Sequence, residues 1–139
     1  MLRGMCTVTY FADDVAAARR WYAELLGIDA YFVRPEQPAP PAYVEFRVGD
    51  DEDELGIIDR RYSPSASGDG QGGTVLYWHV DDVVSTVERL VAFGATPHEP
   101  VTERGEGFVT ASVVDPFGNI LGVMENSHYA ARAAGANAA

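Results

Sequence analysis

Cysteine and basic residues are scarce in this chain of 139 residues. Cys6 is the only cysteine, so a disulfide within the chain is excluded and the composition suits a reducing, cytoplasmic location. The 10 Lys and Arg residues face 21 Asp and Glu residues, which gives a formal net charge of −11. Nucleic acids and anionic membranes are bound through basic patches, so we expect neither as a partner. The same charge favours a cationic ligand.

Long hydrophobic runs are also missing. No apolar stretch approaches the ~20 residues that a membrane-spanning helix needs, and the start of the chain lacks the apolar region and cleavage site of a signal peptide. The P-loop, the dinucleotide fingerprint, zinc-ligand spacing and the nucleophile elbow are absent as well. What remains is 47% hydrophobic and 22% charged residues, which is typical of a globular domain.

The hydrophobic pattern predicts four strands and one helix in each half of the chain. Each helix begins at an acidic N-cap, Asp13 or Asp81, and ends at a glycine, Gly27 or Gly94. The two prolines of 95–101 predict a short or edge strand there. The strands are expected at 7–12, 29–34, 42–48 and 55–59, and then at 74–80, 95–101, 108–114 and 120–125.

Three short phrases recur in the same order and at nearly constant spacing. FADDV (11–15) is echoed by HVDDV (79–83), and LGIID (55–59) by LGVME (121–125), while the helix-ending glycines repeat between them. Recurrence at a fixed period indicates an internal duplication. We therefore predict an α+β fold in one domain, 1–139, built from two β-α-β-β-β modules. Their bounds are 5–62 for module one, 63–73 for a linker, 74–126 for module two, and 127–139 for an alanine-rich tail that frays or forms a short helix.

Two such modules, the DDV-type helix start and the phrase DPFGN (115–119) before the last strand resemble the vicinal oxygen chelate superfamily. That group includes glyoxalase I, bleomycin-resistance proteins, extradiol dioxygenases, methylmalonyl-CoA epimerases and fosfomycin-modifying enzymes. The likeness covers roughly residues 5 to 126. It implies two sheets curled into a cup, helices outside the cup, and frequent homodimers.

Metal-dependent members of the superfamily carry His, Gln or Glu at four positions that face the cup. The resemblance places those positions at Thr7, Gly56, Val75 and Gly122. None offers the nitrogen, sulfur or carboxylate donors that a borderline-soft divalent ion prefers, so we predict no metal and no other cofactor. Each glycine either leaves room where a metal and its ligand would sit, or permits a bulge or close packing in a curled sheet.

A second set of donors would need a different strand register. His79, Asp59 and Glu125 offer one imidazole and two carboxylates. Both acids, however, alternate in phase with Leu55 and Leu121, which we expect to face the helices. These three residues therefore bind a metal only if bulges turn the two acids toward the cup.

Strand alternation selects the polar and aromatic residues of the cup. Its candidates for ligand binding are Phe11, Tyr43, Glu45, Tyr77 and His79, besides the two glycines. The aromatic members form either an amphipathic wall, as in small-molecule sites, or part of the core. Glu45 and His79 form either ligand contacts or a metal-free acid–base pair.

The leading hypothesis is a metal-independent small-molecule binder of the glyoxalase/bleomycin-resistance type, which sequesters a cationic or aromatic ligand and acts as a homodimer. The alternative is a glyoxalase- or dioxygenase-type enzyme, a lyase, isomerase or oxygenase, that uses a divalent metal or the Glu45/His79 pair. A third hypothesis is an assembly protein whose own side chains fill the cup.

Cys6 is expected to be a small buried hydrophobic residue on the outward side of its strand, and His98 and His128 receive no role.

Overall fold

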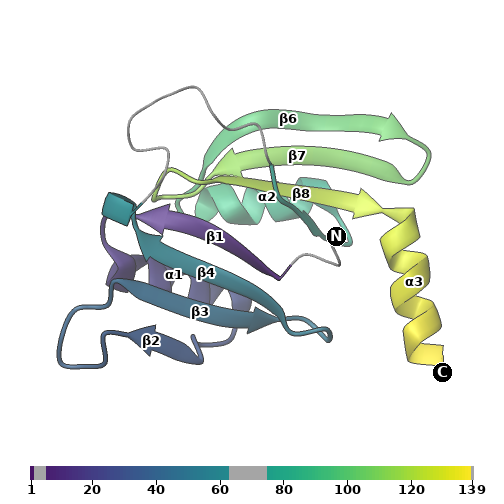
Figure 1. Cartoon of the computed structure of the whole chain (residues 1–139). Coiled ribbons are helices and arrows are strands. Elements are labelled where there is room, and N and C mark those ends of the chain that lie inside the picture. The colour runs from purple at the N-terminus through teal and green to yellow at the C-terminus, as the bar shows by residue number, and fades with distance from the viewer. Residues whose placement is uncertain (2–5, 63–74, 139) are drawn as a thin grey trace. The chain divides into compact units, whose positions relative to one another are not determined.

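The chain folds into two compact units, Met1–Gly72 and Gly73–Ala139, each with its own sheet (Figure 1). This computed structural model describes residues 1, 6–62 and 75–138. The predicted linker, 63–73, lies outside the described residues. We call the sheet of unit 1 the first sheet and that of unit 2 the second sheet.

The same succession of elements occurs in both units. Unit 1 contains β1 (Thr7–Ala12), α1 (Val15–Leu26), β2 (Phe32–Arg34), β3 (Tyr43–Val48), β4 (Asp53–Asp59) and a 3-10 turn, η1 (Arg60–Tyr62). Unit 2 contains β5 (Tyr77–His79), α2 (Val83–Ala92), β6 (Thr96–Gly105), β7 (Phe108–Val114), β8 (Ile120–Asn126) and α3 (Ser127–Ala138).

Equivalent strands take equivalent places in the two sheets. The first sheet has the order β1-β4-β3-β2 and the second β5-β8-β7-β6. The pairs β1–β4 and β5–β8 are parallel, and all other pairs are antiparallel. The predicted duplication and the α+β class are confirmed. The union of the two sheets in one cup and one domain stays a prediction.

Both helices begin one residue later than predicted. Asp14, not Asp13, caps α1 through a hydrogen bond from the Ala17 backbone N–H at 2.9 Å. Asp82, not Asp81, caps α2 in the same way, accepting from the backbone N–H of Ser85 at 3.0 Å. Each phrase contains two adjacent acids that are equally fit to cap. The second acid of each pair becomes the cap because the valine that follows it is buried as the first residue of the helix. These valines are Val15 in α1 and Val83 in α2.

Strand lengths depart from the predictions at the sheet edges. β2 and β5 have only 3 residues each, fewer than the predicted 29–34 and 74–80. β6 has 10 residues and lies at the edge of its sheet, so of the two predicted alternatives, a short or an edge strand, the edge strand is confirmed. Its prolines are tolerated because an edge strand has one free side and its pairing with β7 is irregular between Pro97 and Thr102.

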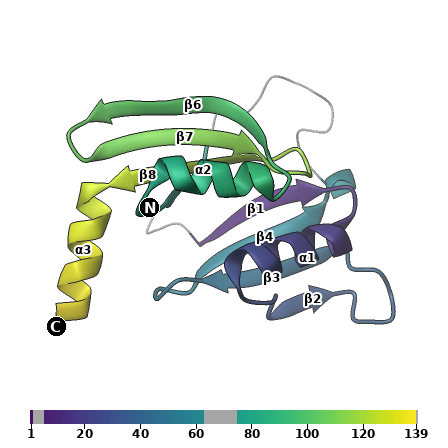
Figure 2. The same ribbon diagram turned by 180° about the vertical axis from the view of Figure 1, so that it is seen from behind.

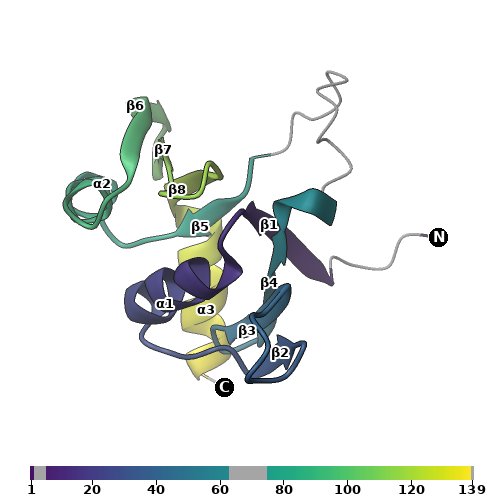
Figure 3. The ribbon, with the colours of Figure 1, turned by 90° about the vertical axis from the view of Figure 1, so that its left-hand side faces the viewer.

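Alternate residues of each sheet form the core with one helix. Helix α1 contacts β1, β3 and β4, and α2 contacts β6, β7 and β8 (Figures 2 and 3). The strand residues under these helices are at most 6% exposed, which amounts to ~1.5–3 kcal/mol for each large apolar side chain. They are Tyr10, Ala12, Val44, Phe46, Leu55 and Ile57 in unit 1, and Ala111, Val113, Leu121 and Val123 in unit 2. We call the opposite surface of each sheet its open face.

Two further expectations concern the ends of the chain. Cys6 is exposed, so the prediction of a buried residue is wrong: it precedes β1, outside the alternating segment that the core covers. The tail forms the helix α3, which continues directly from β8. Within the described residues, no helix combines the length and the apolar character needed to cross a membrane.

Candidate functional site

The open face of the first sheet carries a compact group of aromatic and charged side chains around Glu45. Cross-strand pairing sets Glu45 of β3 between Phe32 of β2 and Gly56 of β4. Tyr43 and Arg47 lie two residues away on the same strand and therefore share its face. The structure thus places Tyr43 and Glu45 on the face predicted from alternation, since the intervening Val44 and Phe46 are both 0% exposed on the helix side.

Two tyrosines hold the carboxylate of Glu45. The hydroxyl of Tyr31 donates to Oε1, and the hydroxyl of Tyr43 donates to Oε2. Hydrogen bonds to an ionised acceptor are about twice as strong as neutral ones, so both rings are fixed relative to the acid. Tyr31 was not singled out from the sequence, because it lies just before β2 and reaches Glu45 only once β2 pairs with β3.

Both phenols are held in the protonated form. Burial and the hydrogen bond to Glu45 raise the pKa of Tyr43 well above its ordinary value. The hydrogen bond to Glu45 also raises the pKa of Tyr31. A phenol that stays protonated at neutral pH can donate a hydrogen bond but cannot act as a general base. The two tyrosines are therefore positioning donors for the carboxylate.

The aromatic rings around Glu45 already attract cations. The guanidinium of Arg47 lies 4.2 Å from the ring centroid of Tyr31, and that of Arg34 lies 4.2 Å from the ring centroid of Phe32. Phe32 in turn meets Tyr43 edge-on, with the centroids 6.1 Å apart. Both distances to the arginines fall within the range of a favourable cation–π contact. The group is thus an aromatic surface with one central carboxylate.

The two echoed glycines make room for tyrosine rings. A Cβ added at Gly56 would lie 2.7 Å from the hydroxyl oxygen of Tyr43 and 2.9 Å from its Cε2 atom. A Cβ added at Gly122 would lie 2.7 Å from Cδ1 of Tyr77 and 2.7 Å from the backbone oxygen of Leu76. The space above each glycine is therefore occupied by an aromatic side chain of a neighbouring strand.

The four positions at which the resemblance implies metal ligands do not fit a divalent ion. The hydroxyl of Thr7 donates to Oε2 of Glu54 at 2.8 Å, Val75 has no donor atom in its side chain, and the other two are the glycines beneath the tyrosines. Within 6–62 and 75–138, no three His, Cys, Asp or Glu side chains come close enough to hold a metal. These four residues therefore offer no donor set for a metal ion.

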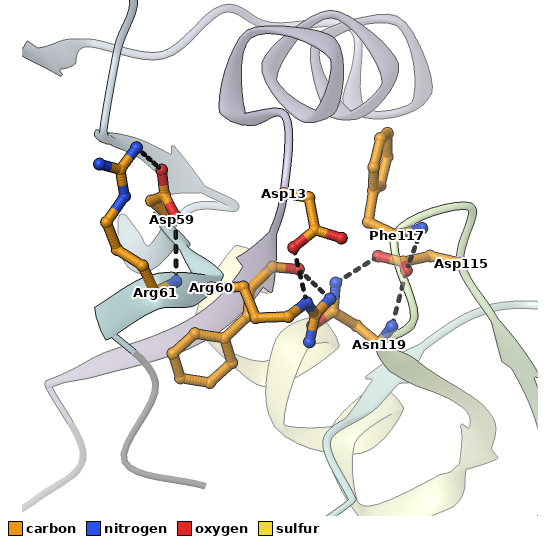
Figure 4. A network of polar contacts seen from close by, with 8 residues as sticks. Asp13, Asp59, Arg60, Arg61, Asp115, Phe117 and Asn119 are labelled. Atoms are coloured by element: carbon orange, nitrogen blue, oxygen red, sulfur yellow. Dashed lines mark hydrogen bonds and ion pairs between the residues drawn. The ribbon is translucent and has the colours of Figure 1, made fainter. Parts of the chain in front are cut away.

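The second predicted donor set is engaged elsewhere. Asp59 accepts from the backbone N–H of Arg61 at 3.0 Å and from its guanidinium at 2.6 Å (Figure 4), and these bonds lower the pKa of Asp59. Glu125 accepts from the backbone N–H of Val83 at 3.0 Å. That contact lies at the first turn of α2, on the helix side expected from strand alternation.

Phe11 lies half-buried on the open face of β1, paired with Ile58 of β4. Its backbone oxygen accepts from the Arg60 guanidinium at 3.3 Å, and the same guanidinium lies 3.3 Å from a carboxylate oxygen of Asp13 (Figure 4). Asp13, which does not cap α1, thus fixes the 3-10 turn after β4 to the end of β1. Phe11 contributes an aromatic ring to the same open face as Glu45.

The open face of the second sheet is more polar. Tyr77 pairs with Gly122, which pairs with Ser112 of β7. The Ser112 hydroxyl lies 2.9 Å from Nδ1 of His98, and the Thr110 hydroxyl accepts from Nε of Arg104 at 3.1 Å. His98 and Arg104 were not predicted to take part, because the irregular register of β6 breaks the alternation from which faces are assigned.

His79 is covered by the C-terminal helix. Its ring stacks on that of Tyr129 in α3, with centroids 4.6 Å apart and planes inclined by 24°. Nε2 lies 3.9 Å from a carboxylate oxygen of Asp81, and Nδ1 is buried without a hydrogen-bond partner among the described residues. Glu45 and His79 belong to different units, so their acid–base pairing stays a prediction.

The phrase DPFGN forms a hydrogen-bonded turn between β7 and β8. Asp115, 3% exposed, accepts at Oδ1 from the backbone N–H groups of Phe117 and Asn119, at 2.9 and 2.8 Å. Its Oδ2 accepts from the side-chain amide of Asn119 at 2.9 Å (Figure 4). Gly118 has a φ of 91°, a conformation that favours glycine. These roles explain the motif by turn geometry.

Comparison with known proteins gives a consistent assignment. The family model described as Glyoxalase/Bleomycin resistance protein/Dioxygenase superfamily matches residues 5–123. No curated protein matches the chain significantly. A lactoylglutathione lyase from Agrobacterium tumefaciens is similar in structure with a TM-score of 0.65 and 21% identity, over 93% of this chain and 98% of that one.

Two other solved structures show the same fold. A member of this superfamily from Sphaerobacter thermophilus has a TM-score of 0.67 and 20% identity, over 90% of this chain and 98% of its own. A glyoxalase-related enzyme from Fulvimarina pelagi has a TM-score of 0.63 and 22% identity, over 88% of each chain. With the family model covering both units, the chain belongs to the Glyoxalase/Bleomycin resistance protein/Dioxygenase superfamily.

Proposed function

We propose that this protein binds a small cationic molecule without a metal, and that the Glu45 carboxylate on the open face of the first sheet receives the positive charge. The observation that carries the proposal is the pair of hydrogen bonds from Tyr31 and Tyr43 to the two oxygens of Glu45. A carboxylate held by two donors is pre-organised for recognition, because less side-chain freedom is lost on binding.

The charge of Glu45 is available to a ligand. Its hydrogen-bond donors are neutral phenols, and among the described residues it takes part in no ion pair. Arg34, whose guanidinium lies over the Phe32 ring, pairs instead with Glu36, at 3.5 Å. The formal charge of −11 adds a long-range attraction for cations. Surrounding aromatic rings add cation–π attraction, of which the chain's own arginines give two examples.

Binding is favoured over proton-transfer chemistry in unit 1. The raised pKa values of Tyr31 and Tyr43 keep both phenols from serving as bases near neutral pH. The positions expected to hold metal ligands present two glycines, a threonine and a valine, which supply no set of donors for a Lewis-acid centre. Sequestration of a ligand requires neither a general base nor a metal centre, since no bond is made or broken.

The test compares one cation, one uncharged reference ligand and two variants. Benzyltrimethylammonium, which joins a ring to a permanent charge, is titrated by NMR against the protein, with uncharged benzyl alcohol as the reference ligand. Glu45→Gln keeps the size of the side chain and removes its charge, and we expect it to weaken binding of the cation by at least ~1 kcal/mol, about fivefold. Binding of benzyl alcohol should change little.

Glu24→Gln is the matched control. It makes the same change in net charge at an exposed position of α1 on the helix side of the first sheet. An equal loss of affinity in both variants would indicate a general charge effect and would remove Glu45 from the binding site. An equal affinity of the native protein for the cation and for benzyl alcohol would reject a cation as the ligand class.

A further inference from the structure

Helix α3 closes part of the second sheet's open face with one aromatic side chain. It begins at Ser127, beyond residues 5–123 that the family model matches, and continues directly from β8 (Figure 1). The backbone N–H of Ser127 donates to the oxygen of Gly107 at 3.0 Å. This contact sets the first turn of α3 so that Tyr129 lies flat against His79, 4.6 Å between the centroids.

Tyr129 covers His79 incompletely. The His79 side chain remains 20% exposed, and Tyr129 itself is 45% exposed. Nδ1 of His79 is nevertheless buried without a hydrogen-bond partner among the described residues. A buried polar atom that has lost water and gained no partner lowers the stability of the arrangement. An occupant that stacks on the imidazole and reaches Nδ1 with a donor outside the plane of its own ring would therefore fit this position better than the tyrosine does.

We infer that His79 is the stacking platform of a subsite for a planar aromatic cation, and that Tyr129 fills this subsite in the free protein until such a ligand displaces it. The preference for a cation follows from Asp81, whose exposed carboxylate lies 3.9 Å from Nε2 of His79. Nδ1 of His79, which has no partner among the described residues, is the ring nitrogen left for a polar group of the ligand.

The inference rests on the proposal that the protein binds small molecules, but it uses neither Glu45 nor any other residue of unit 1. Displacement of Tyr129 costs the stacking interaction with His79. A pair of this kind shifts an equilibrium by roughly 2- to 12-fold. Removing the tyrosine ring should therefore raise the affinity for a stacking ligand by that factor, because the competitor is gone.

The probe is proflavine, a planar aminoacridine cation that tests the stacking part of the subsite, titrated by fluorescence against the full chain. We expect Tyr129→Ala to lower the dissociation constant roughly 2- to 12-fold relative to the native protein. The double variant with His79→Ala should lose this gain. Tyr62→Ala is the matched control. Tyr129 lies beside Arg132, whose guanidinium carbon is 5.4 Å from its ring centroid, and Tyr62 is another exposed tyrosine beside an arginine, but in unit 1. Its removal should leave the dissociation constant unchanged.

A second measurement reports on the stack directly. With ¹³C-labelled histidine, the His79 ring signal in the native protein should carry an upfield ring-current shift that Tyr129→Ala abolishes and proflavine restores.

The inference is overturned if Tyr129→Ala binds proflavine no more tightly, or if the His79 signal does not respond to the variant and the probe. Affinity that depends on Glu45 but not on Tyr129 would reject this inference alone. A gain in Tyr129→Ala with no effect of Glu45→Gln would reject only the role of Glu45, and an absence of binding in every variant would reject both.

Discussion

The glycines of the echoed phrases should differ in their tolerance of a side chain. At Gly56, an added methyl group meets the hydroxyl and ring edge of Tyr43 at 2.7 to 3.1 Å. These atoms form the far end of a side chain that can rotate away, at the expense of its bond to Glu45. At Gly122, the methyl group meets the Leu76 backbone oxygen and the Tyr77 ring, both at 2.7 Å. The carbonyl cannot move without disturbing the bond that it accepts from the backbone N–H of Gly122, 3.0 Å long.

The magnitudes follow from these contacts. Overpacking costs ~1–3 kcal/mol, and replacing glycine by alanine returns ~0.4–1 kcal/mol through the unfolded chain. Gly56→Ala should therefore lower the free energy of unfolding by ~1 kcal/mol. Gly122→Ala should lower it by ~2–2.5 kcal/mol, because the rigid backbone contact adds to the ring contact. Gly135→Ala is the control in α3, where nothing lies within 4 Å of the added Cβ, and it should raise helix stability by ~0.5–1 kcal/mol.

Urea unfolding followed by tryptophan fluorescence measures all three variants. Trp21 lies on α1 of unit 1 and Trp78 on β5 of unit 2, so replacing either by phenylalanine lets the other report on its own unit. The midpoint should fall more for Gly122→Ala, seen by Trp78, than for Gly56→Ala, seen by Trp21. A loss for Gly56→Ala that equals or exceeds the loss for Gly122→Ala would refute the distinction between a yielding side chain and an unyielding backbone.

Two further predictions concern ionisation and metals. In an alkaline titration followed by tyrosine absorbance, Tyr43 should ionise above the ordinary tyrosine value, and Tyr43→Phe should remove one tyrosine from the late part of the titration. Because the pKa of Tyr43 is raised in the folded protein, its contribution to stability is complete below the ordinary value of 10.0 and is lost as the pH rises above it. A single early step for all tyrosines would contradict the contact with Glu45. In native mass spectrometry after incubation with zinc, nickel, iron(II) or manganese salts, the chain should retain no stoichiometric metal, since the four implied ligand positions lack donors; one ion per chain would show that other residues form a metal site.

Local sequence patterns predicted the elements whose signals lie within a few residues of one another. The acid pair before each helix, the glycine that ends α1 and the alternation of β3, β4, β7 and β8 all depend on backbone preferences and on which face a side chain takes. Each signal occurs in both halves, so the duplication could be inferred even where one copy is weak. The error of one residue at Asp13 and Asp81 arose because the adjacent acid caps equally well until the valine that follows is buried.

Tertiary contacts selected the residues of the candidate sites. Tyr31 reaches Glu45 through the pairing of β2 with β3, and Tyr129 reaches His79 through the direction in which α3 leaves β8. Neither contact has a periodic signature, because it joins an irregular or terminal segment to a distant strand. β6 likewise exceeded its predicted length, because an edge strand tolerates the prolines that would interrupt a central one.

The sequence by itself determined the α+β class, the twofold repeat, the faces of the regular strands and the lack of ligands at the implied metal positions, since each depends on residue type and short-range spacing. Only the tertiary structure decided what lies above Gly56 and Gly122. A glycine specifies only the absence of a side chain. The tyrosine ring that fills the space above it comes from a neighbouring strand. The position of that ring is set by the strand order and, for Tyr43, by the hydrogen bond of its hydroxyl to Glu45.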